Sequence, residues 1–144
     1  MSLDRSAARI LAGFTRLFTG VRAGGCLPTA GAVQRVYFAN HASHLDTLVI
    51  WASLPLALRA RTRPVAAADY WDRPGLRRWL AWRVLQALMV TRGGAGSRDA
   101  LHQLIAALDE GDSLILFPEG TRGDGDNVGE LRPGLYHIAR ERPA

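Results

Sequence analysis

Short apolar runs alternate with helix-like segments through most of this sequence, and that alternation limits the fold more than any other feature. The apolar runs cover residues 36–39, 65–68, 88–91 and 113–117, and the helical patterns lie near 45–54, 71–86, 98–109 and 134–141. Strands that alternate with helices predict a layered α/β domain with a mostly parallel sheet flanked by helices. In such sheets ligands gather beyond the carboxyl ends of the strands, so a site is expected in the segments that follow the strands.

The clearest helical pattern is SRDALHQLIAALDEG, residues 97–111. Ser97 is expected to be its N-cap, and Gly111 is expected to stop it. The apolar residues that define its buried face are Leu101, Leu104, Ile105 and Leu108.

Size and charge limit the kind of protein further. A chain of 144 residues that is 48% hydrophobic can bury one core, so one main domain is expected. Its 18 basic residues are all arginine and stand against 13 acidic ones, a net charge of +5. This excess favours anionic partners such as phosphate esters, acidic lipid headgroups or nucleic acid, although an arginine-rich soluble enzyme would look the same. Cys26 stands alone and cannot form an internal disulfide.

The first 24 residues are expected to form an amphipathic helix, followed by an α/β domain over residues 25–144. No stretch reaches the ~18 apolar residues of a membrane span, and Gly13 and Arg16 interrupt the apolar pattern in a way that disfavours a secretory signal. The helix is predicted either to lie in a membrane interface or to dock on the domain. Its apolar residues recur at spacings of three and four, namely Leu3, Ala7, Ile10, Leu11, Phe14, Leu17, Phe18 and Val21.

NHASHLD, residues 40–46, follows the first apolar run. His41 is expected in the strand-to-helix turn, with Ser43 as N-cap and Asp46 at the place of a capping-box acid. From the turn, the His41 ring can fold back to the Asp46 carboxylate, which would hold one ring nitrogen protonated and leave the other to accept a proton from an alcohol. The alternative is purely structural, with Asp46 a helix-start acid and His41 a turn residue.

A metal site is the less favoured interpretation of the same stretch. Its two histidines, His41 and His44, are three apart, no histidine follows Asp46, and His102 and His137 are the only others in the chain. That donor set is a poor match to the ligand runs of zinc hydrolases, so no metal is expected.

FPEGTR, residues 117–122, follows the last apolar run. Gly120 lets backbone N–H groups approach an anion, Thr121 supplies a hydroxyl, and Arg122 offers a planar fork of donors. The segment is therefore predicted to bind phosphate at the same edge of the sheet as His41. The glycine-rich stretch that follows, residues 120–134, is expected to be irregular.

Together these motifs resemble the glycerolipid acyltransferase family, typified by 1-acyl-sn-glycerol-3-phosphate (lysophosphatidate) acyltransferases. NHASHLD matches the family's NHxxxxD block, FPEGTR follows about seventy residues later as in the family, and LMVTRG, residues 88–93, stands where the family has an intermediate block ending in arginine. The similarity spans roughly residues 34–140. It implies a glycerol-3-phosphate acyltransferase-like α/β fold.

The resemblance also implies an activity. The chain would be an acyltransferase of phospholipid biosynthesis that moves a fatty acyl group from acyl-CoA or acyl-carrier protein to a hydroxyl of lysophosphatidate or a related glycerol-phosphate lipid. His41 would be the general base, Asp46 would orient it, and neither a metal nor another cofactor would be needed. The residues that would position the acceptor phosphate are Arg92, Glu119, Gly120, Thr121 and Arg122. His44 falls in the variable part of the block and is expected at the surface or behind the site.

Two features depart from the family. After GTR the sequence continues GDGD, where relatives often have Ser and then Arg or Lys, and the Pro-containing fourth block is absent, because the sequence given stops soon after LRPGLYHIAR. The expectation is either a fragment or a shortened member of the family. A non-catalytic module that binds lipid or a phosphoanion therefore remains an alternative function, and a metal-dependent hydrolase a less favoured one.

The segment of residues 69–88 suits a membrane-surface enzyme. Tryptophans and arginines interleave in it, a combination fitted to lipid headgroups; they are Trp71, Trp79, Trp82, Arg73, Arg77, Arg78 and Arg83. An ordinary helix packed on the sheet with its arginines in water would give the same pattern. The resulting expectation is peripheral attachment to an anionic membrane surface, at the cytoplasmic face. No nucleic-acid partner is expected, because such a partner would leave both motifs unexplained.

Overall fold

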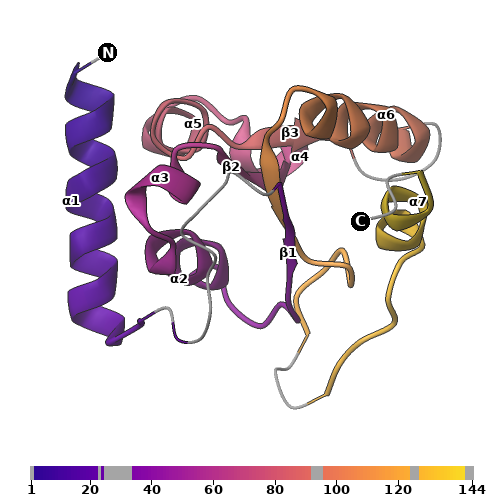
Figure 1. Ribbon diagram of the computed structural model, residues 1–144, viewed down its shortest axis with the longest axis horizontal. Helices are drawn as coiled ribbons and strands as arrows, with labels where there is room; N and C mark the ends of the chain where they lie inside the picture. Colours follow the sequence, from indigo (N-terminus) through magenta and orange to yellow (C-terminus); the bar gives the residue numbers. More distant parts are fainter. Residues whose placement is uncertain (1, 23, 25–33, 92–95, 124–126, 142–144) are drawn as a thin grey trace.

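The computed structural model describes residues 2–22, 24, 34–91, 96–123 and 127–141. Four strands and a series of helices alternate along the chain, as the sequence pattern predicts (Figure 1). In order they are α1 (Ser2–Thr19), β1 (Val36–Phe38), α2 (Asp46–Ser53), α3 (Leu56–Arg59), β2 (Thr62–Ala67), α4 (Ala68–Trp71), α5 (Leu76–Trp79), the π-helix η1 (Leu80–Val84), β3 (Leu88–Val90), α6 (Gly96–Asp109), β4 (Ser113–Leu116) and α7 (Gly134–Glu141).

All strand pairs in the sheet are parallel, and the strand order is β1-β4-β2-β3. The predicted layered fold with a mostly parallel sheet is thereby confirmed. The first and last strands of the sequence are direct neighbours, with Phe38 opposite Leu116. The segments that follow β1 and β4 therefore leave the sheet at the same level, and these segments carry the two motifs.

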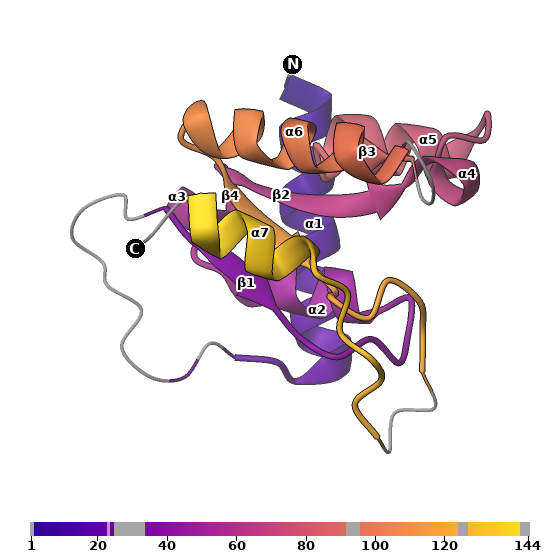
Figure 2. The same cartoon turned by 90° about the vertical axis from the view of Figure 1, so that its right-hand side faces the viewer.

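Helices cover both faces of the sheet. Leu114 and Leu116 of β4 pack with Ala107, Leu108 and Ile138 of α6 and α7, which lie together on one face (Figure 2). Ile115, between them in sequence, faces the other way and packs in the cluster described next. Because β4 is buried on both faces, it reads as a continuous apolar run rather than an alternating one.

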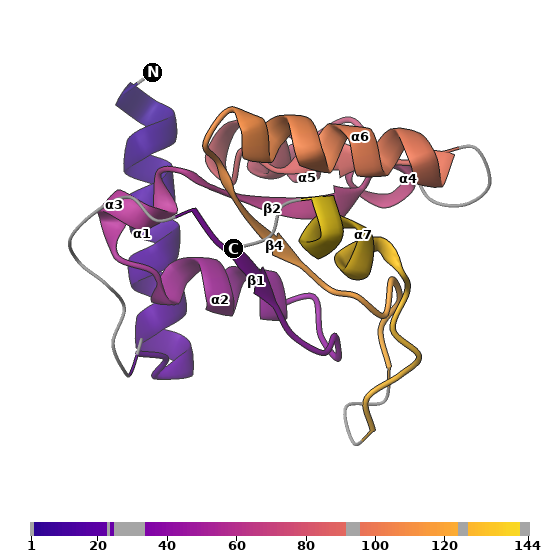
Figure 3. The same cartoon turned by 45° about the vertical axis from the view of Figure 1, so that its right-hand side comes forward.

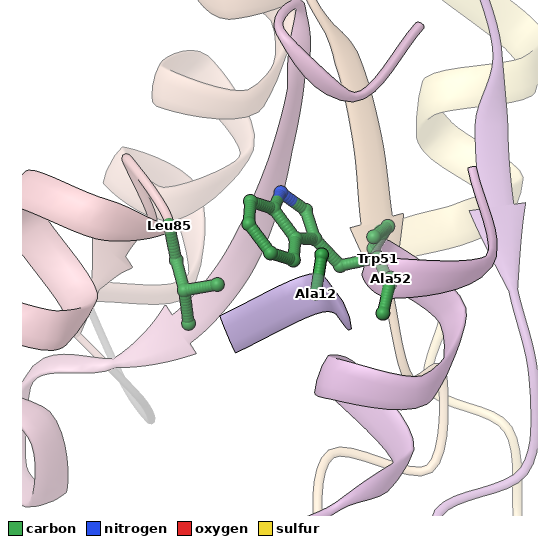
Figure 4. Packing of buried hydrophobic residues seen from close by; sticks show 5 residues of the cluster. Ala12, Trp51, Ala52 and Leu85 are labelled. Carbon is green, nitrogen blue, oxygen red and sulfur yellow. The ribbon is translucent and has the colours of Figure 1, made fainter. Parts of the chain in front are cut away.

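The core of the opposite face includes residues from α1, α2 and the segment after η1. Ala12, Trp51, Ala52 and Leu85 form one buried cluster with Ile115 (Figure 4). α1 is the outermost layer, beyond α2 and η1 (Figures 1 and 3).

Polar contacts also hold α1 to the body of the protein. Arg16 donates from Nε to the carbonyl oxygen of Ala52 at 2.5 Å and from Nη2 to that of Leu54 at 2.8 Å, at the carboxyl end of α2. A cation is favourable at this end of a helix. No helix within the described ranges combines the length and the apolar character needed to cross a bilayer.

The predicted continuous helix over 71–86 is wrong. The chain forms α4, leaves the helical conformation at 72–75, and resumes as α5 and η1. Pro74 lacks a backbone N–H. Gly75 has a φ of 111°, a backbone conformation that residues other than glycine rarely adopt. The apolar periodicity runs across this break, so it could not reveal it.

The expected end of α6 is confirmed, but its expected start is not. Gly111 has a φ of 84° just after the last turn, which confirms the expected stop. The helix begins at Gly96, so Ser97 lies inside the first turn and is not the N-cap.

Candidate active site

The turn after β1 brings His41 and Asp46 together. The Nδ1 atom of His41 lies 3.0 Å from Oδ2 of Asp46, with the two side chains 19% and 27% exposed. The same Oδ2 accepts hydrogen bonds from the backbone N–H groups of Ala42 at 2.8 Å and Ser43 at 2.7 Å. The carboxylate thus fixes both the imidazole and the turn that carries it.

Ser43 is not the N-cap of α2, contrary to the sequence expectation. The helix begins at Asp46, and the N-cap position, Leu45, makes no side-chain capping bond. Ser43 Oγ accepts instead from the N–H of Leu45 at 3.1 Å. Asp46 still accepts from the N–H of Ser43, but as the first residue of the helix it does not form the expected capping box.

Asp46 is held as a carboxylate. Burial acts to raise the pKa of Asp46, but the hydrogen bonds from Ser43, His41 and Ala42 outweigh it and lower the pKa below the ordinary value. Since an ionised carboxylate only accepts hydrogen bonds, Nδ1 of His41 must be the donor. Nε2 of His41 is then the ring nitrogen left to act as an acceptor in the neutral imidazole.

The loop after β4 packs directly on this turn. The ring of Phe117 stacks on that of His41 with centroids 4.1 Å apart and planes 19° apart. The N–H of Gly123 donates to the carbonyl oxygen of His41 at 2.8 Å. The two motifs, about seventy residues apart in sequence, therefore pack against each other.

A cavity of about 780 Å³ opens beside His41. Its polar lining residues gather around the segment after β4, and they are His41, His44, Thr121, Arg122 and Arg132. Its remaining wall is largely apolar, and includes Ala66, Leu85, Val90, Leu104, Leu116 and Ile138. A site of this size with a few polar groups at one end suits an amphiphilic ligand such as a lipid.

Gly120 is needed at its position for two reasons. Its φ of 71° is in the left-handed region that favours glycine. A Cβ atom there would also lie 2.5 Å from Nε of Arg132 and 2.7 Å from its Cδ. The missing side chain thus makes room for Arg132, whose own backbone N–H donates to the carbonyl oxygen of Pro118 at 2.8 Å.

The side chain of Glu119 does not line the cavity. It is 6% exposed. A Cβ at Gly123 would lie 3.4 Å, and one at Gly129 3.3 Å, from its Oε2 atom. Glu119 therefore packs under the glycine-rich loop, while Gly120, Thr121 and Arg122 line the cavity. The predicted phosphate contact Arg92 lies outside the described residues.

Sequence reasoning missed two residues of the polar wall. Arg132 was not expected there, and the signal that could have found it is the LRPG stretch that closes the glycine-rich loop. His44 was expected at the surface or behind the site, and it is exposed, but it also lines the cavity and contacts Arg122.

Within the described part of the chain, no group of three or more His, Cys, Asp or Glu residues lies close enough together to hold a metal ion.

A family model and a curated protein both match this chain. The family model described as "Acyltransferase" matches residues 27–144. The lyso-ornithine lipid O-acyltransferase of Pseudomonas aeruginosa (strain PAO1) is 31% identical over 106 residues, which are 74% of this chain and 38% of that protein.

A solved structure gives the fold. The crystal structure of the 1-acyl-sn-glycerophosphate (LPA) acyltransferase PlsC from Thermotoga maritima superposes with a TM-score of 0.64 at 22% identity, and covers 96% of this chain and 54% of that one. The predicted acyltransferase-like α/β fold is thereby confirmed. The chain spans about two fifths of the length of the curated relative and about half of the solved one. The family match covers most of the sequence and includes both motifs, and the chain therefore belongs to the acyltransferase family.

Proposed function

We propose that this chain transfers a fatty acyl group from a thioester, acyl-CoA or acyl-carrier protein, to a hydroxyl of a lysolipid with an anionic headgroup. One observation carries the proposal: the His41–Asp46 pair, with 3.0 Å between Nδ1 and Oδ2, borders a cavity that has arginines at its polar end and an apolar interior. The family membership supports the reaction class.

The proposed mechanism uses His41 as general base. Nε2 takes the proton of the acceptor hydroxyl as its oxygen attacks the thioester carbonyl carbon. The tetrahedral intermediate collapses, the carbon–sulfur bond breaks, and the imidazolium returns the proton to the departing thiolate. Asp46 keeps the ring oriented and stabilises its transient positive charge.

Arg122 and Arg132 are proposed to hold the acceptor's anionic headgroup, with Gly120 and Thr121 at the same wall. Guanidinium groups form paired, charge-assisted hydrogen bonds with phosphate or carboxylate oxygens. Among the described residues, no Asp or Glu lines the cavity. That charge pattern favours an acceptor such as lysophosphatidate over one that carries an ammonium group.

A lyso-ornithine lipid is the second candidate acceptor. The observation in its favour is the 31% identity to a lyso-ornithine lipid O-acyltransferase. Its carboxylate could meet the same arginines, but its ornithine also carries an ammonium group, for which no described acidic residue lines the cavity. Comparing the two acceptors as substrates at equal concentration therefore separates the two proposals.

The decisive experiment measures thiol release by purified protein given acyl-CoA, a lysolipid and lipid vesicles. We expect release that requires both substrates and disappears in His41→Ala. Vesicle or phosphoanion binding without any thiol release would overturn catalysis and favour the non-catalytic binding module instead.

We also propose that α1 attaches the protein peripherally to an anionic membrane surface, at the cytoplasmic face. Five large apolar side chains on α1 are exposed, from 64% for Phe14 to 86% for Leu17: Leu3, Ile10, Phe14, Leu17 and Phe18. A contiguous apolar stripe of this kind supports a contact with lipid, and the exposed Arg5 and Arg9 on the same helix support an anionic one.

Co-sedimentation with vesicles tests this attachment. We expect binding to anionic vesicles that weakens with added salt and is lost in Phe14→Ser/Leu17→Ser. His102→Ala, on the far side of the sheet from α1, is the control. Equal binding to neutral and anionic vesicles, unaffected by salt, would contradict the anionic surface.

A further inference from the structure

The second histidine of the first motif contacts the arginine of the second motif. His44 lies in the turn before α2, and its Nε2 atom is hydrogen-bonded to Nη1 of Arg122, 78 positions away in sequence. A guanidinium group has donors and no acceptor, so Nε2 must accept this bond. The neutral His44 ring therefore carries its proton on Nδ1.

Tyr70 packs against the His44 ring, and Arg77 packs on Tyr70 in turn. The ring of Tyr70, in α4, stacks on His44 with centroids 5.0 Å apart and planes 16° apart. The Tyr70 hydroxyl lies 3.4 Å from Nε2 of His44. The guanidinium carbon of Arg77, in α5, lies 4.9 Å from the Tyr70 ring centroid. Arg122 and Tyr70, from two separate parts of the chain, thus contact one imidazole.

The electrostatic surroundings keep that imidazole neutral. Desolvation lowers the pKa of His44, and the positive charges of Arg122, His41 and Arg77 lower it further. These three groups are the charged and titratable neighbours that act on the ring. A protonated ring would have no acceptor for Arg122, so the lowered pKa preserves the contact at neutral pH.

We infer that His44 is a positioning residue that holds the Arg122 guanidinium against the cavity wall, ready for the acceptor's anionic headgroup, and that Tyr70 keeps the ring in place. This inference rests on the proposed function. Its physical basis is preorganisation: an arginine already fixed in its binding conformation loses less side-chain entropy when the acceptor binds. His44 and Arg122 both line the cavity, as does Tyr70.

Steady-state kinetics provide the first test. In His44→Ala we expect the acceptor KM to rise about tenfold, because an unrestrained Arg122 side chain loses more conformational entropy when the acceptor binds, with kcat and the donor KM nearly unchanged. His44→Gln, whose Oε1 can accept from Arg122, should restore most of the affinity. In an Arg122→Ala background, His44→Ala should raise the KM no further.

Two kinetic results would overturn the inference. Additive effects of His44→Ala and Arg122→Ala would mean that His44 binds the acceptor independently. A fall in kcat with an unchanged acceptor KM would mean that His44 takes part in the chemical step or in the general fold of the site.

Nitrogen NMR of labelled histidine tests the contact without any activity. We expect a protonated Nδ1 and an unprotonated Nε2 for His44, and a change of this tautomer in Arg122→Ala, with His102 as the unaffected reference. Protonated Nε2 in the unaltered protein would overturn the positioning role even if acyl transfer occurs. Absence of acyl transfer together with the expected tautomer would instead count against the proposed function alone.

Discussion

Two corners of the site are built in different ways. In the histidine corner, which comprises His41, Asp46 and the N–H groups of Ala42 and Ser43, the bonded partners are at most five positions apart. The arginine corner comprises Arg122, Arg132, Gly120 and His44. The partners of Arg132 are 12 to 14 positions from it, and His44 is 78 positions from Arg122.

This difference separates what each corner depends on. The hydrogen bonds within the histidine corner all lie inside the strand-to-helix turn. In the arginine corner, Arg132 meets Gly120 within the loop after β4, whereas Arg122 meets His44 only because β1 and β4 lie side by side, so that the segments after them meet. We therefore expect changes in the histidine corner to affect mainly the rate of acyl transfer, and changes in the arginine corner to affect mainly the binding of the acceptor.

The largest expected effect is at His41. His41→Ala should lower kcat by about 10² to 10⁴ because the general base is lost, with a much smaller change in the acceptor KM. Thiol-release kinetics measure both values. His102→Ala, an exposed histidine on α6, is the matched control and should keep full activity. A kcat within a few-fold of that of the unaltered protein would show that His41 is not the general base.

Next in size are the two arginines. Arg122→Ala and Arg132→Ala should each raise the acceptor KM about 10- to 100-fold, through loss of charge-assisted hydrogen bonds to the headgroup, with kcat changed little. Arg98→Ala, an exposed arginine on α6, is the control and should leave the KM unchanged. A fall in kcat with an unchanged acceptor KM would contradict the expectation that the arginine corner acts mainly in acceptor binding.

A smaller effect is expected at Gly120. In Gly120→Ala the new Cβ displaces the Arg132 side chain, so the acceptor KM should rise about tenfold. Because alanine is strained at this left-handed φ, the free energy of unfolding should also fall by about 1 to 2 kcal/mol. Gly20 has a similar φ of 67° and nothing within 4 Å of its Cβ position.

Gly20→Ala is therefore the matched control for Gly120→Ala. It should lower stability by a similar amount, as measured by urea unfolding, and leave the KM unchanged. An equal KM change in both variants would show that strain, and not Arg132, is responsible.

The smallest effect concerns Asp46 and pH. Because its folded pKa is below the ordinary 3.8, the carboxylate stabilises the folded state above that pH, and its contribution is lost as the pH falls through the folded pKa. Asp46→Asn should thus reduce the free energy of unfolding by about 1 kcal/mol at neutral pH, because a neutral amide oxygen accepts the hydrogen bonds from Ala42, Ser43 and His41 more weakly than a carboxylate does. The difference from the unaltered protein should shrink below pH 3.8. Urea unfolding measured across this range would contradict the argument if the difference stayed constant.

Sequence patterns predicted the fold class well and some boundaries poorly. The central strand β4 was evident as an apolar run because both of its faces are buried. The helix predicted over 71–86 failed because apolar periodicity continues past Pro74 and Gly75, where the backbone turns away. Ser43 and Ser97 were misjudged as caps, because cap identity depends on where the first helical turn actually begins.

The sequence by itself determined the histidine corner and the parallel α/β class. His41 and Asp46 meet within a single turn, and the alternation of strands and helices permits few other folds. Only the tertiary structure decided the arginine corner. The LRPG stretch marks the end of the glycine-rich loop but does not indicate that the Arg132 side chain crosses Gly120, and nothing near His44 indicates that it contacts Arg122. The first contact depends on how the loop after β4 folds back on itself, and the second on the pairing of β1 with β4, which brings together residues 78 positions apart.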